Sequence, residues 1–176
     1  AAPPTQDLEW SDSGIEGAHR FINKLYRLVV EFVEESKTHE TTSLVPSSLN
    51  NNQKELRRKT HQSLKKVGDD FGRRHSFNTA IASMMELNNS LSRFIDSSPQ
   101  GMAVRQESIG IMLKALSPVI PHLCHHLWAA LGNNEAMIDA LWPKVDESAL
   151  IQEEVQLVVQ VNGKLRAKLM APLDAE

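Results

Sequence analysis

The sequence has a single cysteine, no long apolar run and no excess of basic residues. Cys124 alone cannot form an intramolecular disulfide, so we expect a reducing, cytoplasmic environment. No stretch of about 18 apolar residues is present, which argues against a membrane span. The 176 residues carry 19 Lys and Arg against 22 Asp and Glu, a net charge of −3. That balance excludes a uniformly basic nucleic-acid-binding protein but not a local basic face.

The common catalytic motifs are missing as well. The sequence has no phosphate-binding loop, no dinucleotide glycine pattern and no Gly-x-Ser-x-Gly. His122 and His126 are four residues apart and could share a metal ion, but a zinc site needs three or four ligands. A metal-dependent enzyme is therefore an alternative for which the sequence offers two ligands but not the third or fourth. We predict no catalytic residue, no metal site and no cofactor within this chain.

Apolar residues recur every three or four positions over five segments, as in amphipathic helices. This pattern, with mostly short connections, predicts an antiparallel helical bundle. The first helix is expected to start at Ser13, whose side chain and Glu16 fit a capping box. The expected helices cover 13–36, 52–71, 77–96, 98–116 and 118–131, with Phe77, Ile81, Met84, Asn88, Leu91 and Ile95 facing inward from the third.

The composition of the sequence changes after Gly132, and this change marks the expected domain boundary. Residues 134–154 are rich in acids and form the predicted linker. A β-branched run, the turn signal Asn162-Gly163 and an alternating return segment then predict a β-hairpin. The fold class is therefore mainly α, a bundle of about five helices followed by a short β-hairpin that begins a truncated α/β C-terminal domain. We expect a piece of a longer protein, divided into a leading segment 1–12, a bundle 13–133, a linker 134–154 and the start of a second domain 155–176.

Basic residues gather in one part of this acidic chain. Between Gln53 and His75 there are eight Lys and Arg but three acids, and Arg20, Lys24 and Arg27 lie on the first helix. These side chains either solvate a bundle or contact the phosphates of a nucleic acid. Because few aromatic residues accompany them, a structured RNA suits them better than a stacked single strand. Composition alone leaves the choice open.

Four motifs in order resemble one enzyme family. The segment Leu8–Phe21, with Trp10-Ser11-Asp12-Ser13-Gly14-Ile15-Glu16-Gly17, resembles the start of the anticodon-binding-type helical domain of bacterial leucyl-tRNA synthetases, which are class I aminoacyl-tRNA synthetases. The segment 73–82 looks like the central bundle helix of that family, and 116–122 with Leu127-Trp128 is similar to its last helix. Trp142-Pro143, Asp146 and 158–167 look like the start of its C-terminal tRNA-binding domain.

The resemblance implies a role in leucine–tRNA ligation. The parent enzyme would activate leucine with ATP and Mg²⁺, transfer it to tRNA and hydrolyse mischarged products. Since no His-Ile-Gly-His or Lys-Met-Ser-Lys-Ser type motif is present, this chain would not be catalytic alone. The implied partners are leucine tRNA and the remaining domains of the same synthetase, without a membrane, in a monomeric parent.

We hypothesise that the basic residues hold the tRNA body through phosphate contacts during leucylation and editing. The alternating Lys164 and Arg166 share one face of the predicted return strand and would extend that surface. The alternative is a helical scaffold or interaction bundle without its own nucleic-acid binding. The predicted tRNA-binding residues are Arg20, Lys24, Arg57, Arg58, Arg73, Arg74, Lys164 and Arg166.

Overall fold

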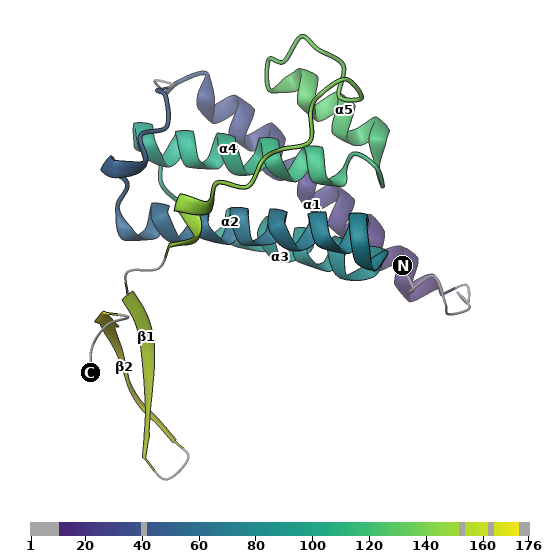
Figure 1. Ribbon diagram of the computed structural model, residues 1–176. Coiled ribbons are helices and arrows are strands. Elements are labelled where there is room, and N and C mark those ends of the chain that lie inside the picture. The colour runs from purple at the N-terminus through teal and green to yellow at the C-terminus, as the bar shows by residue number, and fades with distance from the viewer. Residues whose placement is uncertain (1–10, 40–41, 152–153, 162–163, 173–176) are drawn as a thin grey trace.

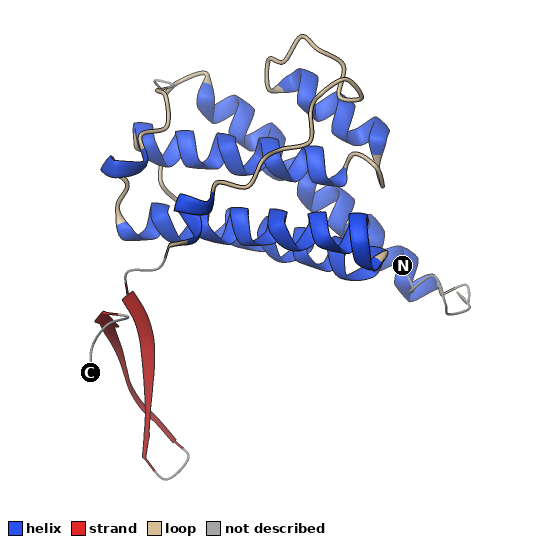
Figure 2. Ribbon diagram, viewed as in Figure 1, coloured by secondary structure: helices blue, strands red, loops and turns tan. Residues whose placement is uncertain are grey.

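The computed structural model describes residues 11–39, 42–151, 154–161 and 164–172, the last two ranges as backbone. Within these ranges the chain is mainly helical and has five α-helices, as predicted (Figures 1 and 2). They are α1 (Asp12–Ser36), α2 (Asn51–Asp69), α3 (Phe77–Arg93), α4 (Pro99–Leu116) and α5 (Pro121–Ala130). Shorter turns are the 3₁₀ helices η1 (Pro46–Ser48) and η3 (Glu147–Leu150) and the π-helix η2 (Asp70–Arg74). None of the described helices is both long and apolar enough to cross a membrane.

The helices pack around α3 and α4. Helix α3 contacts α1, α2 and α4, and α4 also contacts α5. Consecutive helices α2 and α3 run antiparallel, as do α3 and α4, so α2 and α4 run in the same direction (Figure 1). Gln53 of α2 donates a hydrogen bond to Ser98, the cap of α4, and a second hydrogen bond joins the hydroxyls of Thr60 in α2 and Ser108 in α4. Helix α1 crosses this group, and α5 packs against both α1 and α4 (Figure 1).

The core follows most of the predicted apolar stripes. Leu64 and Val67 of α2, and Met84 and Leu91 of α3, are at most 2% exposed. Ile95 was predicted to face inward and is 94% exposed, so that expectation is wrong. The reason is that α3 ends at Arg93 and Phe94 takes an extended backbone conformation, which breaks the helical period before residue 95. Phe77, also predicted inside, is 43% exposed at the start of α3.

Helix starts differ from the predictions by a few residues. Ser11, not Ser13, caps α1 by accepting a hydrogen bond from the Gly14 amide. Helix α2 begins with a capping box formed by Asn50 and Gln53, two residues before the predicted start. The predicted Ser98 cap on α4 is confirmed, since its hydroxyl accepts from the Gly101 amide at 3.1 Å.

The end of the bundle also departs from expectation in one respect. Helix α5 begins at Pro121 rather than Pro118, which lies in the turn after α4. Proline at the first helical position loses no needed donor, so either residue could have started the helix. The predicted end of α5 at Gly132 is confirmed, because this residue adopts a φ of +88°, a conformation that favours glycine.

Two antiparallel strands follow the helices. Strand β1 (Glu154–Val161) pairs with β2 (Lys164–Pro172), and the register is irregular between Val159 and Gln160. The predicted turn residues 162–163 lie outside the described residues. The hairpin as a whole, and the C-terminal domain that it would begin, therefore stay predictions.

Gly101 of α4 lies close to Asp96 in the turn between α3 and α4. A Cβ there would stand 2.7 Å from the backbone oxygen of Asp96, whereas one at Gly110 would stand 3.8 Å from Trp128. We expect Gly101→Ala to lower the free energy of unfolding by about 1–3 kcal/mol through overpacking. Gly110→Ala is the matched control and should gain up to about 1 kcal/mol from helix propensity. Urea denaturation measures both; equal stabilities would contradict the prediction.

His75 follows the π-helix η2 with a left-handed backbone, at φ 51° and ψ 34°. Its side chain is exposed, so substitutions there act mainly through the backbone. We expect His75→Val to cost about 1–2 kcal/mol of stability, because a β-branched residue tolerates this conformation poorly. His75→Asn should change stability much less, since Asn enters this region readily. A thermal or chemical unfolding curve for each variant tests this; an equally stable Val variant would disprove it.

Candidate nucleic-acid interface

The predicted cations of α1 lie on one side of that helix, toward α3. The Arg20 side chain is 71% exposed and its Nη1 lies 3.6 Å from Glu16. Lys24 Nζ donates a hydrogen bond to Asn89 Oδ1 of α3 at 2.6 Å. Arg27 Nε donates to the backbone oxygen of Asn23 on its own helix. All three therefore keep donors available to solvent, as a phosphate-binding surface requires.

The adjacent arginines of α2 have opposite environments. Arg58 is partly exposed and has no carboxylate partner in the described part of the chain. Arg57 is 6% exposed, and its guanidinium donates to Glu107 of α4 and to Asp146 beyond α5. The structure therefore places Arg57 inside the bundle, where it cannot reach a phosphate without breaking these pairs. We therefore leave Arg57 out of the phosphate-binding surface proposed below.

Arg57 belongs to a cluster of four side chains, which we call the Arg57 cluster: Arg57, His61, Glu107 and Asp146. The amide of Asp146 donates to His61 Nδ1 at 3.1 Å, so the other ring nitrogen, 3.3 Å from Glu107, carries the proton of the neutral ring. Burial alone would raise the pKa of Glu107, but hydrogen bonds from His61 and Arg57 hold it below the ordinary value. Hydrogen bonds from Ser148 and Arg57 likewise hold the pKa of Asp146 well below its ordinary value.

Part of the predicted acidic linker is bound to the bundle through the Arg57 cluster. Asp146 is tied to α2 through both its backbone and its carboxylate. Glu147 accepts hydrogen bonds from Lys65 of α2, and η3 packs on that helix. At least this part of residues 134–154 is therefore attached to the bundle rather than simply solvated.

Arg73 and Arg74 lie at the far end of α2, in the π-helix. Arg73 forms two hydrogen bonds with Asp69, at 2.6 and 2.9 Å, which lower the pKa of that exposed carboxyl. Arg74 lies 3.2 Å from Asp70, whose side chain is fully buried and also accepts from Thr79. Arg73 is thus free to exchange its partner in solvent, whereas Arg74 also neutralises a buried carboxylate.

The remaining predicted residues, Lys164 and Arg166, lie on β2, and their side chains are outside the described part of the structure. Among the predicted residues whose side chains the structure describes, Arg73 and Arg74 lie in η2, away from the others. The structure brings together the α1 cations and Arg58, on either side of the turn between α3 and α4.

Two hollows flank that turn. The α1 hollow, about 890 Å³, is lined by Arg20, Lys24 and Arg27. The α2 hollow, about 690 Å³, is lined by Arg58, Lys59 and Arg93. The sequence analysis did not select Arg93, because the predicted helix continues past it to residue 96. Its place as the last residue of α3 depends on where the helix ends.

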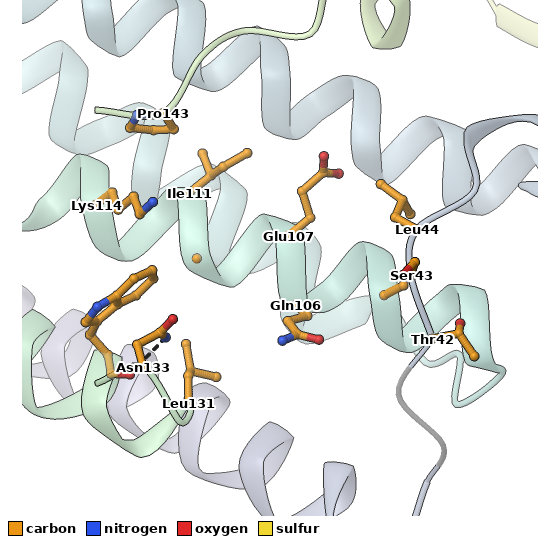
Figure 3. A pocket seen from close by; sticks show the side chains of 13 residues that line it. Thr42, Ser43, Leu44, Gln106, Glu107, Ile111, Lys114, Leu131, Asn133 and Pro143 are labelled. Atoms are coloured by element: carbon orange, nitrogen blue, oxygen red, sulfur yellow. Dashed lines mark hydrogen bonds between the residues drawn. The ribbon is translucent and has the colours of Figure 1, made fainter. Parts of the chain in front are cut away.

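A third hollow, of about 390 Å³, lies where α4 meets α5 and the segment after α1 (Figure 3). Its charged lining residues are both in use. Glu107 belongs to the Arg57 cluster, and the Lys114 ammonium lies 4.9 Å from the centre of the Trp128 ring. Asn133 donates to the backbone oxygen of Trp128. We assign this hollow no chemistry, since both of its charged side chains already have protein partners.

In the described part of the chain, the histidines of α5 do not lie beside other metal-binding side chains. His122 and His126 are exposed, and His126 stacks on Tyr26 of α1 with ring centres 6.4 Å apart. Cys124 is fully buried, which raises the pKa of its thiol to about 12 and disfavours a metal-binding thiolate. In the described residues no three His, Cys, Asp or Glu side chains stand close enough to hold a metal ion.

A family comparison decides what this bundle is. Residues 53–176 match the family model described as the anticodon-binding domain of tRNA ligase. The chain belongs to this family. The matched residues contain nearly all of α2, the whole of α3 to α5, and all four members of the Arg57 cluster, including Asp146 beyond α5.

Relatives of the whole chain are leucine–tRNA ligases. The enzyme of Ruthia magnifica is 56% identical over 176 residues, which are 100% of this chain and 21% of that protein. The Marinobacter nauticus enzyme is 52% identical over 174 residues, 99% of this chain and 20% of that protein. A crystal structure of the Agrobacterium radiobacter LeuRS–tRNA–LeuAMS ternary complex has a TM-score of 0.75 at 28% identity, covering 96% of this chain and 21% of that one. The chain thus spans about a fifth of the length of these relatives.

Proposed function

We propose that this chain is the tRNA-binding helical domain of a leucine–tRNA ligase. The observation that carries the proposal is the identity of more than half of its residues, over nearly the whole chain, with enzymes of that name. The likeness to a LeuRS chain in complex with tRNA supports it. Leucine activation with ATP and Mg²⁺, transfer to tRNA and editing would belong to the rest of the enzyme.

The proposed task of the domain is to hold the tRNA body while the acceptor end reaches the active sites. Arg20, Lys24, Arg58, Arg73 and Arg74 supply phosphate contacts from exposed or half-exposed positions. Phosphate contacts fix the position and orientation of a nucleic acid but carry no sequence information. Recognition of leucine tRNA over other tRNAs therefore needs additional contacts, within or outside this domain.

The Arg57 cluster has a different task in the proposed function. It holds Asp146 against α2 and α4, shortly before β1 begins at Glu154. We infer that it fixes the direction in which the chain leaves the bundle toward a C-terminal tRNA-binding domain. Lys164 and Arg166 of β2 would extend the tRNA surface from there.

The proposed partners are leucine tRNA and the other domains of a monomeric, cytoplasmic ligase. A scaffold without nucleic-acid binding is the second candidate, favoured by the ion pairs that already engage Arg20 and Arg73. Fluorescence anisotropy of labelled leucine tRNA with the full-length protein, at low salt, distinguishes the two. The tRNA-holding role predicts weaker binding when Arg20, Arg58 and Arg73 are replaced by Gln. Unchanged affinity in that variant would favour the scaffold.

A further inference from the structure

The turn between α3 and α4 displays an isoleucine to solvent. Ile95 is 94% exposed, whereas Leu91, one helical turn earlier, is 2% exposed. Phe94, between them, packs against the core. A β-branched apolar side chain so exposed gains nothing for folding, because it removes almost no surface from water.

This turn is held by three helices. Asp96 accepts hydrogen bonds from the Ser98 amide at 2.9 Å and from Gln53 of α2 at 2.8 Å. The Ser97 hydroxyl donates to Glu35 of α1, and Ser98 caps α4. Ile95 is therefore presented from a turn with a defined shape. Such preorganisation lowers the entropy lost when a ligand binds.

The two hollows described above share this turn as a common wall, formed by Phe94, Ile95 and Asp96. Arginines with unused hydrogen-bonding capacity stand on both sides. Arg58 and Arg93 have no carboxylate partner among the described residues, and Arg27 bonds just the backbone oxygen of Asn23.

Two of the acidic side chains near the turn, Asp96 and Glu35, already have partners. The Asp96 carboxylate is occupied by the hydrogen bonds of the turn, which hold its pKa below the ordinary value against the opposing effect of burial. Glu35 pairs with Arg105 at 2.7 Å. Glu31 and Glu55 are exposed and each lines one hollow, where three basic side chains outnumber it. The arrangement matches the chemistry of a polynucleotide. The guanidinium groups on either side of Ile95 suit two successive phosphates, and the apolar side chain suits the base or ribose that lies between those phosphates.

We propose that Ile95 contacts an unpaired nucleotide of the bound tRNA, packing against its base or ribose. Arg58 and Arg93 bind the phosphates on one side of that nucleotide, and Arg27 binds the phosphate on the other. The inference rests on the proposed tRNA-binding function and names the point of contact. A protein surface is a poorer match, because it would have to supply carboxylates to the arginines on both sides of the turn.

The test compares two exposed isoleucines in the full-length protein. We expect Ile95→Ala to weaken binding of leucine tRNA about five- to tenfold at both low and moderate salt, because an apolar contact releases no counterions. Arg58→Gln with Arg93→Gln should instead flatten the log–log salt slope by about 1.8, at about 0.9 per lost phosphate contact. Ile138→Ala is the matched control, since Ile138 is 91% exposed but lines neither hollow. It should leave the affinity unchanged.

The outcomes separate this inference from the proposed function. If wild-type protein binds tRNA and Ile95→Ala behaves like Ile138→Ala, the contact is refuted and the tRNA-holding role stands. If wild-type protein does not bind tRNA, both the Ile95 contact and the tRNA-holding role are refuted. A photoreactive amino acid at position 95 adds a direct readout: crosslinks to tRNA support the contact, and crosslinks confined to protein overturn it in favour of a protein partner.

Discussion

Replacing Arg20, Arg58 and Arg73 by Gln is expected to make tRNA binding less sensitive to salt. Each lost phosphate contact flattens the log–log salt slope by about 0.9, so three flatten it by about 2.7. The ratio of the tRNA affinity of the wild-type protein to that of the variant should therefore fall roughly 40-fold as salt rises from about 50 to about 200 mM. Anisotropy titrations of labelled leucine tRNA with the full-length protein measure this change.

The choice of these three residues follows from their surroundings. Arg20 and Arg73 form exposed pairs with acids on their own helices, and such pairs contribute little to stability. Arg74 is left in place because it neutralises the buried Asp70.

A second triple variant controls for net charge. Lys37, Lys65 and Lys144 carry the same total charge, lie outside both hollows and can also be replaced by Gln. If this variant flattens the slope as much as the arginine variant, the effect is a general one of net charge and the proposed surface is wrong.

Arg57→Ala is expected to destabilise the bundle by about 2–4 kcal/mol, toward the lower end of what breaking a buried ion pair costs. The guanidinium is 6% exposed, and its removal leaves Glu107 and Asp146 without their main counter-charge. The cost is not larger because these carboxylates keep 24% and 37% of their side-chain surface exposed. Urea denaturation gives the free energy of unfolding.

The neighbouring residue provides the control for this prediction. Arg58→Ala removes the same side chain one position later on α2, where it has no carboxylate partner in the described structure, and should cost less than about 0.5 kcal/mol. Similar losses for the two variants would mean that the Arg57 cluster does not stabilise the fold.

The effect of Arg57→Ala should also depend on pH. The pKa of Asp146 lies below its ordinary value in the folded protein, owing to hydrogen bonds from Ser148 and Arg57, and the pKa of Glu107 is lowered as well. Carboxyls with lowered pKa values stabilise the folded state above their unfolded pKa of about 4, and this contribution is lost as the pH falls below it. The difference between wild type and Arg57→Ala should therefore be full near neutral pH and shrink in acid.

Local sequence patterns were enough to predict the helical class and most of the core. Apolar spacing placed Leu64, Val67 and Met84 inside, and Ser98-Pro99 marked the start of α4. These features depend on local physics, namely the period of the α-helix and the capping of its first amides, which a short window of residues already contains. The helix starts at Ser11 and Asn50 were missed by a few residues because several nearby side chains could serve as caps.

Tertiary structure alone decided which basic residues stay on the surface. Arg57 and Arg58 are neighbours of the same type, but successive side chains on a helix point about 100° apart, so one meets α4 and the linker while the other meets solvent. Asp146 reaches Arg57 across 89 positions of sequence, a pairing that no local pattern encodes. Ile95 likewise depended on where α3 ends, because the anchored turn with Gln53 and Glu35 competes with another helical turn and carries the isoleucine outward.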